Sequence, residues 1–117
     1  WPFRFQRVDE DQPNDTVVEL VRLLKRDGYR IVFLSGRPDS CRGATKTWLD
    51  THVGPGEELL MRKAGDNRSD EIVKLELFRQ ICNDPTEVFL VLDDRNKVVD
   101  MWRSIGLTCL QVAQGDF

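Results

Sequence analysis

The stretch Val88-Phe89-Leu90-Val91-Leu92-Asp93-Asp94 decides the expected fold of this chain. Five consecutive apolar residues predict a strand that is buried on both faces, as strands are in parallel sheets covered by helices. Two carboxylates follow immediately. Because ligands bind beyond the carboxyl ends of the strands in open parallel sheets, this acidic pair marks the expected position of a functional site.

Helices and further strands alternate around this stretch. The apolar run 30–35 predicts a buried strand that ends at Gly36, and the segments 58–61 and 109–112 predict two more strands. Apolar residues recur at helical spacing in four segments, each with a capping or terminating residue: 14–27 with the cap Asn14 and the stop Gly28, 41–52 with the cap Ser40, a stripe from Ile72 to Ile81 with the cap Ser69, and Val98 to Ile105 with the stop Gly106. This order predicts an α/β fold with helices layered around a parallel sheet.

Composition limits the class of protein. The 117 residues include 17 Lys and Arg against 20 Asp and Glu, a formal net charge of −3, and 40% of them are hydrophobic. These values predict one small globular domain over 1–117 and argue against intrinsic disorder. The apolar runs are far shorter than the roughly 20 residues of a membrane helix, and the cysteines Cys41, Cys82 and Cys109 form no C-x-x-C pair. We therefore expect a cytoplasmic protein with no membrane partner, whose mild acidity still allows a local basic cleft.

The segment Ser35-Gly36-Arg37 follows the first apolar strand and is the first candidate site. It offers a hydroxyl group, a residue without a side chain that lets a ligand approach the backbone, and a guanidinium group suited to phosphate. The alternative is an ordinary turn between a strand and a helix, with a solvated arginine.

Asp93 and Asp94 form the second candidate site. Two adjacent carboxylates repel each other, and Mg²⁺ offsets such repulsion well because it binds one or two carboxylates together with water and phosphate oxygens. For Asp94 there is an alternative role as the cap of the following helix.

Asp70 and Lys74 lie four residues apart on one face of a predicted helix whose N-terminus should face the same crevice. A solvated salt bridge is one interpretation. The other is that Lys74 meets a phosphate while Asp70 holds a basic group in place. Together with the two preceding candidates, these residues favour phosphoryl chemistry.

The order of these signals is similar to that of a known superfamily. Ser35 after a strand, Lys74 in a later helix and the Asp93-Asp94 pair resemble the second, third and fourth motifs of haloacid dehalogenase-superfamily phosphatases. The longer runs 31–37, 65–70 with Lys74, 92–95 followed by 98–103, and 111–117 resemble the 3′-phosphatase domain of phage-type polynucleotide kinase-phosphatases. This resemblance implies a three-layer, Rossmann-like parallel sheet.

The resemblance also implies a role for each candidate residue. In such enzymes an aspartate attacks phosphorus to form an aspartyl-phosphate, and a second aspartate protonates the leaving 3′-oxygen. Four catalytic residues are implied: Ser35 and Arg37 contact the phosphoryl group, Lys74 stabilises its negative charge, and Asp70 orients the basic groups. Gly36 and Arg68 are the implied substrate-binding residues. Asp93 and Asp94 are the implied Mg²⁺ ligands. The implied partner is a 3′-phosphorylated nucleic acid end.

One expected motif is missing. The chain contains no D-x-D-G-T sequence, which in this superfamily carries the nucleophile. The resemblance places that motif after a first strand in the middle of the sheet, between the strands that end at Ser35 and Asp93. We expect this strand to precede Trp1 in a longer parent protein, and the chain alone to be inactive and to fold poorly.

Two other interpretations stay open from the sequence. One is a phosphomonoesterase of the same superfamily that acts on a small molecule, and the other is a non-catalytic α/β binding module. The chain has no G-x-x-x-x-G-K-[ST] loop and therefore no 5′-kinase site of its own, although the resemblance suggests an adjacent kinase domain in the parent.

Overall fold

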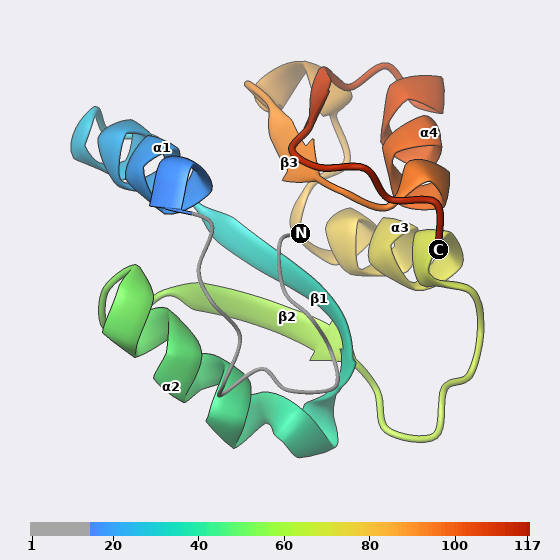
Figure 1. Cartoon of the computed structure of the whole chain (residues 1–117). Coiled ribbons are helices and arrows are strands. Elements are labelled where there is room, and N and C mark those ends of the chain that lie inside the picture. Colours follow the sequence, from blue (N-terminus) through green and yellow to red (C-terminus); the bar gives the residue numbers. More distant parts are fainter. Residues whose placement is uncertain (1–14) are drawn as a thin grey trace.

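The computed structural model describes residues 15–117 and shows alternating helices and strands (Figure 1). In chain order the elements are α1 (Asp15–Arg26), β1 (Val32–Pro38), the 3₁₀ turn η1 (Asp39–Cys41), α2 (Arg42–His52), β2 (Glu58–Arg62), α3 (Asp70–Ile81), the 3₁₀ turn η2 (Pro85–Glu87), β3 (Val91–Asp93), α4 (Asn96–Ser104) and β4 (Cys109–Gln111). The predicted α/β fold is confirmed. The helix cap predicted at Asn14 lies outside the described residues.

The described strands form two separate parallel pairs. β1 pairs with β2, with Val32 opposite Glu58 and Ser35 opposite Met61. β3 pairs with β4 over three residues on each strand. Within residues 15–117, β1 and β3 are not hydrogen-bonded to each other. This separation lies where the resemblance places an additional strand.

The helices cover the strands on two faces, which gives three layers. One hydrophobic cluster joins α1 and α2 to Phe33 of β1 and Leu92 of β3. The other joins α3 and α4 to Leu34 of β1 and Val91 of β3. Neighbouring residues of each strand therefore enter opposite clusters, as expected for strands buried on both faces. The two pairs of strands share both layers of helices.

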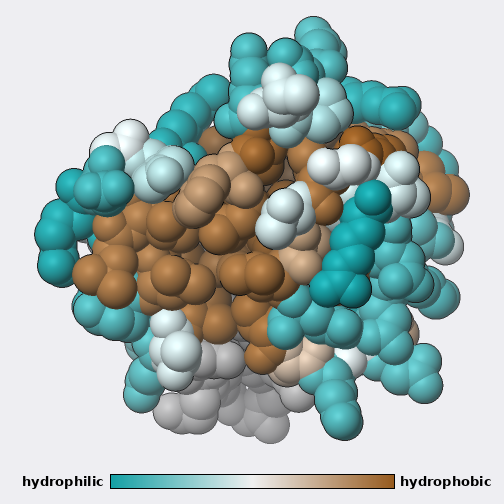
Figure 2. Space-filling model, turned by 90° about the horizontal axis from the view of Figure 1, so that it is seen from above, coloured by the Kyte–Doolittle hydropathy of each residue, from teal (hydrophilic) through white to brown (hydrophobic). Residues whose placement is uncertain are grey.

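An apolar cavity of about 400 Å³ lies between the two pairs of strands. Its lining includes Ile31, Val32 and Leu34 on the β1 side, and Leu90, Val91 and Leu92 on the β3 side. Figure 2, which views the molecule from the side where β1 and β3 begin, shows a broad hydrophobic surface there. β1 and β3 thus face each other across an apolar cavity.

β1 differs from the prediction because it continues through Gly36 and Arg37 to Pro38, whereas the sequence predicts a strand that ends at Gly36. Its register with β2 shifts here, since Ser35 lies opposite Met61 whereas Pro38 lies opposite Arg62. Gly36 and Arg37 lie in this irregular part of the ladder, which changes the direction of the residues that follow Ser35.

Two other predicted boundaries change, and one predicted cap acts through its backbone. The Ser40 cap is wrong, because Ser40 lies inside η1 and α2 follows Cys41 at its N-cap. Ser69 is the N-cap of α3 as predicted, but its backbone carbonyl, rather than its side chain, accepts hydrogen bonds from Ile72 and Val73. β3 begins only at Val91 rather than at Val88, because residues 88–90 are in neither η2 nor a strand.

The predicted terminating glycines follow the ends of two helices. Gly28 follows α1 with φ of 96° and Gly106 follows α4 with φ of 91°, a left-handed conformation that favours glycine.

None of the helices in residues 15–117 combines the length and the apolar character that crossing a membrane requires.

Candidate active site

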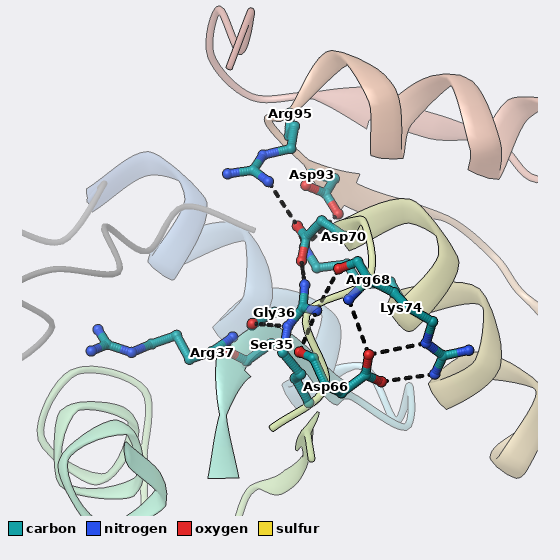
Figure 3. Close-up of polar contacts among 10 residues, drawn as sticks. Ser35, Gly36, Arg37, Asp66, Arg68, Asp70, Lys74, Asp93 and Arg95 are labelled. Atoms are coloured by element: carbon teal, nitrogen blue, oxygen red, sulfur yellow. Dashed lines mark hydrogen bonds and ion pairs between the residues drawn. The ribbon is translucent and has the colours of Figure 1, made fainter. Parts of the chain in front are cut away.

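The carboxyl ends of β1 and β3 meet around the first turns of α3, where most of the candidate residues gather (Figure 3). Lys74 lies at the centre. Its side chain is only 2% exposed, and its Nζ is 3.1 Å from Asp93 Oδ2 and 3.8 Å from Asp70 Oδ2. The Asp70–Lys74 pair is therefore not a solvated salt bridge, because both of its charges are buried and a third charged residue joins them.

Asp93 ends β3, and its carboxylate is almost fully hydrogen-bonded. Oδ2 accepts hydrogen bonds from Lys74 Nζ at 3.1 Å and from Trp102 Nε1 at 3.3 Å, whereas Oδ1 accepts one from the backbone N–H of Asp94 at 2.8 Å. Burial alone would raise the pKa of Asp93, but nearby positive charges, the Lys74 ammonium among them, hold this pKa well below its usual range. Asp93 is consequently a fixed negative charge.

Asp70 gathers three cations around one buried carboxylate. Arg62 Nη2 lies 3.2 Å from Oδ1, and Oδ2 lies 3.7 Å from Arg95 Nη1 and 3.8 Å from Lys74 Nζ. Arg62, Lys74 and Arg95 thus surround one carboxylate. These cations, next to a helix N-terminus, make this region suitable for binding an anion such as a phosphoryl group.

Gly36 allows β1 to approach this network. A Cβ atom added at Gly36 would lie 1.9 Å from Asp70 Oδ1 and 2.8 Å from Asp70 Cγ, far inside van der Waals contact. A glycine is therefore required for the close approach of the β1 backbone to Asp70.

Ser35 and Arg37 lie on either side of Gly36. Ser35 is 1% exposed, and its Oγ accepts a hydrogen bond from the backbone N–H of Arg37 at 3.1 Å. The Arg37 side chain is also buried, but Figure 3 shows that it points away from Asp70, Asp93 and Arg95. The structure thus brings the serine, but not the guanidinium group of Arg37, to the cation cluster.

Arg68 forms a separate, exposed cluster. Its guanidinium binds Asp66 through Nε and Nη2 and Glu76 through Nη1 and Nη2, at 2.6–3.0 Å. The side-chain hydrogen bonds from Arg68 lower the pKa of both carboxyl groups, and those to Asp66 and Glu76 raise the pKa of Arg68. Arg68 therefore lies outside the Lys74 network, with its charge engaged by two neighbours.

Comparison with known proteins gives this arrangement a family. The family model that describes the phosphatase domain of the polynucleotide kinase PNKP matches residues 1–117. The chain belongs to this family of haloacid dehalogenase-type phosphatase domains. The parallel α/β fold and the resemblance noted in the sequence are both confirmed.

Several known proteins are similar to this phosphatase domain. A protein of Autographa californica nuclear polyhedrosis virus, described as a bifunctional polynucleotide kinase/RNA ligase, is 33% identical over 101 residues, which are 85% of this chain and 15% of the viral protein. Two solved structures of a Pnkp1/Rnl/Hen1 complex, one described as an RNA repair complex, match with a TM-score of 0.89 and 39% identity over 100% of this chain. The chain covers 38% and 40% of the matched chains, so it corresponds to one part of larger proteins.

A metal site in the phosphatase domain would depend on Asp93 and Asp94. Among residues 15–117, no group of three or more His, Cys, Asp and Glu side chains is placed to hold a metal ion. Mg²⁺, however, needs only one or two carboxylates together with water and substrate oxygens. Asp93 lies at the end of β3 with its Oδ1 hydrogen-bonded to the backbone N–H of Asp94, and Asp94 is not the N-cap of α4, a position that Arg95 occupies. The two residues therefore fit a partial Mg²⁺ ligand set.

Sequence reasoning missed three contributors to the site: Arg62, Arg95 and Trp102. Arg62 is the last residue of β2. Because ligands bind beyond the carboxyl ends of parallel strands, the position of Arg62 at the end of this strand was a signal that could have identified it. Arg95 directly follows the acidic pair, but nothing in the sequence indicates its contact with Asp70. The hydrogen bond of Trp102 to Asp93 had no sequence signal, because an apolar helical stripe predicts only packing.

Proposed function

We propose that this phosphatase domain removes the 3′-terminal phosphate from a nucleic acid end in a Mg²⁺-dependent reaction that passes through an aspartyl-phosphate. One observation carries the proposal: a buried lysine ammonium lies between two buried carboxylates, Asp70 and Asp93, at the carboxyl ends of parallel strands. Phosphoryl transfer is catalysed mainly by positioning and by neutralising charge, and this arrangement is suited to both. The family membership supports the same reaction class.

In this proposal each residue of the site has a distinct role. The Ser35 hydroxyl donates a hydrogen bond to the transferring phosphoryl group, and Gly36, a further proposed substrate contact, brings the β1 backbone next to Asp70. Lys74 stabilises the negative charge that the group carries in the transition state. Asp70 orients the surrounding cations, because Arg62 and Arg95 both contact it.

Asp93 and Asp94 would hold Mg²⁺, which when bound supplies further positive charge against the phosphoryl oxygens. Arg37 and Arg68 remain proposed substrate contacts at the edge of the site. For Arg37 this role requires its side chain to turn toward the site, since it points away from the cation cluster. For Arg68 a phosphate would have to compete with Asp66 and Glu76.

The nucleophile would arrive on an additional parallel strand between β1 and β3. The described strands leave an apolar cavity of about 400 Å³ at this place, and β1 and β3 are not paired with each other. A strand inserted parallel to both would end beside Ser35 and Asp93, close to Lys74. The D-x-D-G-T sequence does not occur in this chain, so we propose that a segment outside these 117 residues supplies this strand.

In the proposed reaction, a carboxylate oxygen of the first aspartate of the D-x-D-G-T sequence forms a bond to phosphorus while the bond from phosphorus to the nucleotide 3′-oxygen breaks. The second aspartate gives its proton to that oxygen. Water, deprotonated by the same aspartate, next attacks phosphorus, releases inorganic phosphate and restores the first carboxylate. Lys74 remains positively charged throughout.

Phosphate release by the full-length protein tests the proposal. The substrates are RNA and DNA oligonucleotides with a 3′-phosphate, the same oligonucleotides with a 5′-phosphate, and p-nitrophenyl phosphate, each with Mg²⁺ or with EDTA. We expect Mg²⁺-dependent release from 3′-phosphates, with a kcat/KM that exceeds that of the small ester and falls as salt rises. An equal preference for the small ester, independent of salt, would instead indicate a small-molecule phosphatase. A complete absence of release would indicate a non-catalytic module.

A further inference from the structure

Arg62 makes more polar contacts than any function so far requires of it. Its side chain is 13% exposed, and all three guanidinium nitrogens donate hydrogen bonds. Nε donates to the carbonyl of Gly36 at 2.7 Å, Nη1 to the carbonyls of Asp66 at 3.0 Å and Arg68 at 2.5 Å, and Nη2 to Asp70 Oδ1 at 3.2 Å. One side chain thus contacts four acceptors on three segments of the chain.

These three segments carry the candidate site. Gly36 lies in the irregular part of β1 directly after Ser35, where the ladder with β2 shifts its register. The carbonyls of Asp66 and Arg68 belong to the loop between β2 and α3. Asp70 is the first residue of α3, one turn before Lys74. Arg62 therefore ties the end of β1, the loop and the beginning of α3 together.

The contact with Asp70 also sets the orientation of its carboxylate. Arg62 and the backbone of Gly36 both lie against Oδ1. Oδ2 is consequently the oxygen that faces Lys74 and Arg95, at 3.8 Å and 3.7 Å. If Arg62 were removed, the carboxylate could rotate and Lys74 would lose its fixed neighbour on α3.

Only an arginine can make this set of contacts. The guanidinium is a planar group with five N–H donors on two edges, whereas a lysine ammonium is a point charge with three donors on one atom. A lysine at this position could keep the charge and one of the contacts, but it could not reach both the β1 carbonyl and the loop carbonyls.

We infer that Arg62 is a positioning residue, which holds the irregular end of β1, the loop 63–69 and Asp70 in the single arrangement that aligns Lys74 with the phosphoryl group. This role rests on the proposed phosphatase function. The arrangement itself, however, is a property of the chain and can be measured without activity.

The test compares Arg62→Lys with Arg42→Lys in the full-length protein. Arg42 is a matched control, because it also donates to a backbone carbonyl, that of Leu59 at 3.0 Å, but it lies at the start of α2 and not in β1, the loop 63–69 or α3. The first measurement is amide hydrogen exchange in the loop 63–69. The second is kcat and KM for an oligonucleotide with a 3′-phosphate.

For Arg62→Lys we expect amide exchange in the loop to rise about tenfold or more while the β1 and α4 amides stay protected. We expect kcat to fall about tenfold to a hundredfold, as misplacement of catalytic groups produces, with KM changed less than about threefold. Arg42→Lys should change neither measurement. In Arg62→Ala, millimolar guanidinium should restore part of kcat, whereas sodium at the same ionic strength should not.

The inference is overturned if Arg62→Lys keeps the exchange pattern and the kcat of the wild type. It is also overturned if exchange rises over the whole chain and guanidinium rescues nothing, because Arg62 would then serve only global stability. If the wild-type protein releases no phosphate from any substrate, the proposed function fails, and the loop exchange alone decides whether Arg62 holds this arrangement.

Discussion

Lys74 and Arg68 stand close together in the sequence, and each binds two carboxylates, but their surroundings differ. The side chain of Lys74 is 2% exposed and contacts Asp70 and Asp93 at 3.8 and 3.1 Å, whereas that of Arg68 is 48% exposed and binds Asp66 and Glu76 at 2.6–3.0 Å. The exposed cluster has the shorter contacts. Its charges are nevertheless screened by water, so the contact distance does not rank the two clusters by importance.

The difference between the two clusters shows that burial determines how strongly an ion pair affects stability and catalysis. A buried charge without its partner is costly, and the same low polarity strengthens its effect on a bound phosphoryl group. An exposed pair contributes little to stability and can rearrange. We therefore expect substitutions in the Lys74 network to change both folding and chemistry, and substitutions in the Arg68 cluster to change neither strongly.

The largest effect is expected for Lys74→Met. This substitution leaves the carboxylate of Asp93 buried without its ammonium partner, and breaking a buried pair in this way costs about 3–5 kcal/mol. Urea unfolding of the full-length protein measures the change. Lys97→Met is the control, because Lys97 is exposed on α4 and its loss should change the free energy of unfolding by less than about 0.5 kcal/mol. Equal effects of the two substitutions would contradict the distinction between buried and exposed charges.

A smaller effect is expected for Gly36→Ala. The added methyl group would collide with the carboxylate of Asp70, and forced overpacking of this kind costs about 1–3 kcal/mol. Gly43→Ala provides a matched control in α2, since nothing lies within 4 Å of an added Cβ there and alanine favours a helix by about 1 kcal/mol. Thermal unfolding should show opposite shifts for the two variants. Shifts of the same sign would show that β1 does not approach Asp70 this closely.

The pH dependence of stability should distinguish Asp93 from Asp66. The pKa of Asp93 is lowered in the folded state, so its stabilisation is complete above the unfolded pKa of about 3.9 and is lost as pH falls below that value. Asp93→Asn should therefore be less stable than the wild type at pH 6, with a difference that shrinks toward pH 3. Asp66 also has a lowered pKa, but it lies in the exposed cluster, so the effect of Asp66→Asn should be smaller and should decrease in 1 M salt.

The smallest effect is expected for Arg68→Ala. Loss of this exposed arginine should lower the free energy of unfolding only slightly, and less at high salt. If Arg68 also contacts substrate, KM should rise a few-fold at an unchanged kcat. A loss of several kcal/mol, or a large fall in kcat, would show that the exposed cluster belongs functionally to the Lys74 network.

The sequence predicted most of the architecture because its signals are local. Apolar runs and glycine stops located the strands and helices, and the rule of strand ends located Ser35 and Asp93. The sequence predicted less of the contacts between segments that are far apart in the chain. The register shift that draws Gly36 and Arg37 into β1, and the replacement of the Ser40 cap by a 3₁₀ turn, depend on how β1 meets β2 and α3.

The same limit applies to the site residues. Lys74 and Asp70 were predicted from helical spacing, but nothing local indicated that both would be buried with Asp93. Arg62 and Arg95 reach Asp70 from β2 and from the N-terminus of α4, a convergence that only the tertiary fold creates. Conversely, Arg68 is adjacent in sequence to the site, yet its nearest acidic neighbours draw it into a separate cluster.

The most direct test of the account is the rate at which the full-length protein releases phosphate from an oligonucleotide with a 3′-phosphate, compared between Lys74→Met and Arg68→Ala. We expect Lys74→Met to lower kcat by about a hundredfold or more, as loss of a group that stabilises the transition state does, and Arg68→Ala to leave kcat within about threefold of the wild type. A Lys74→Met enzyme that is folded and retains the kcat of the wild type would contradict the central claim.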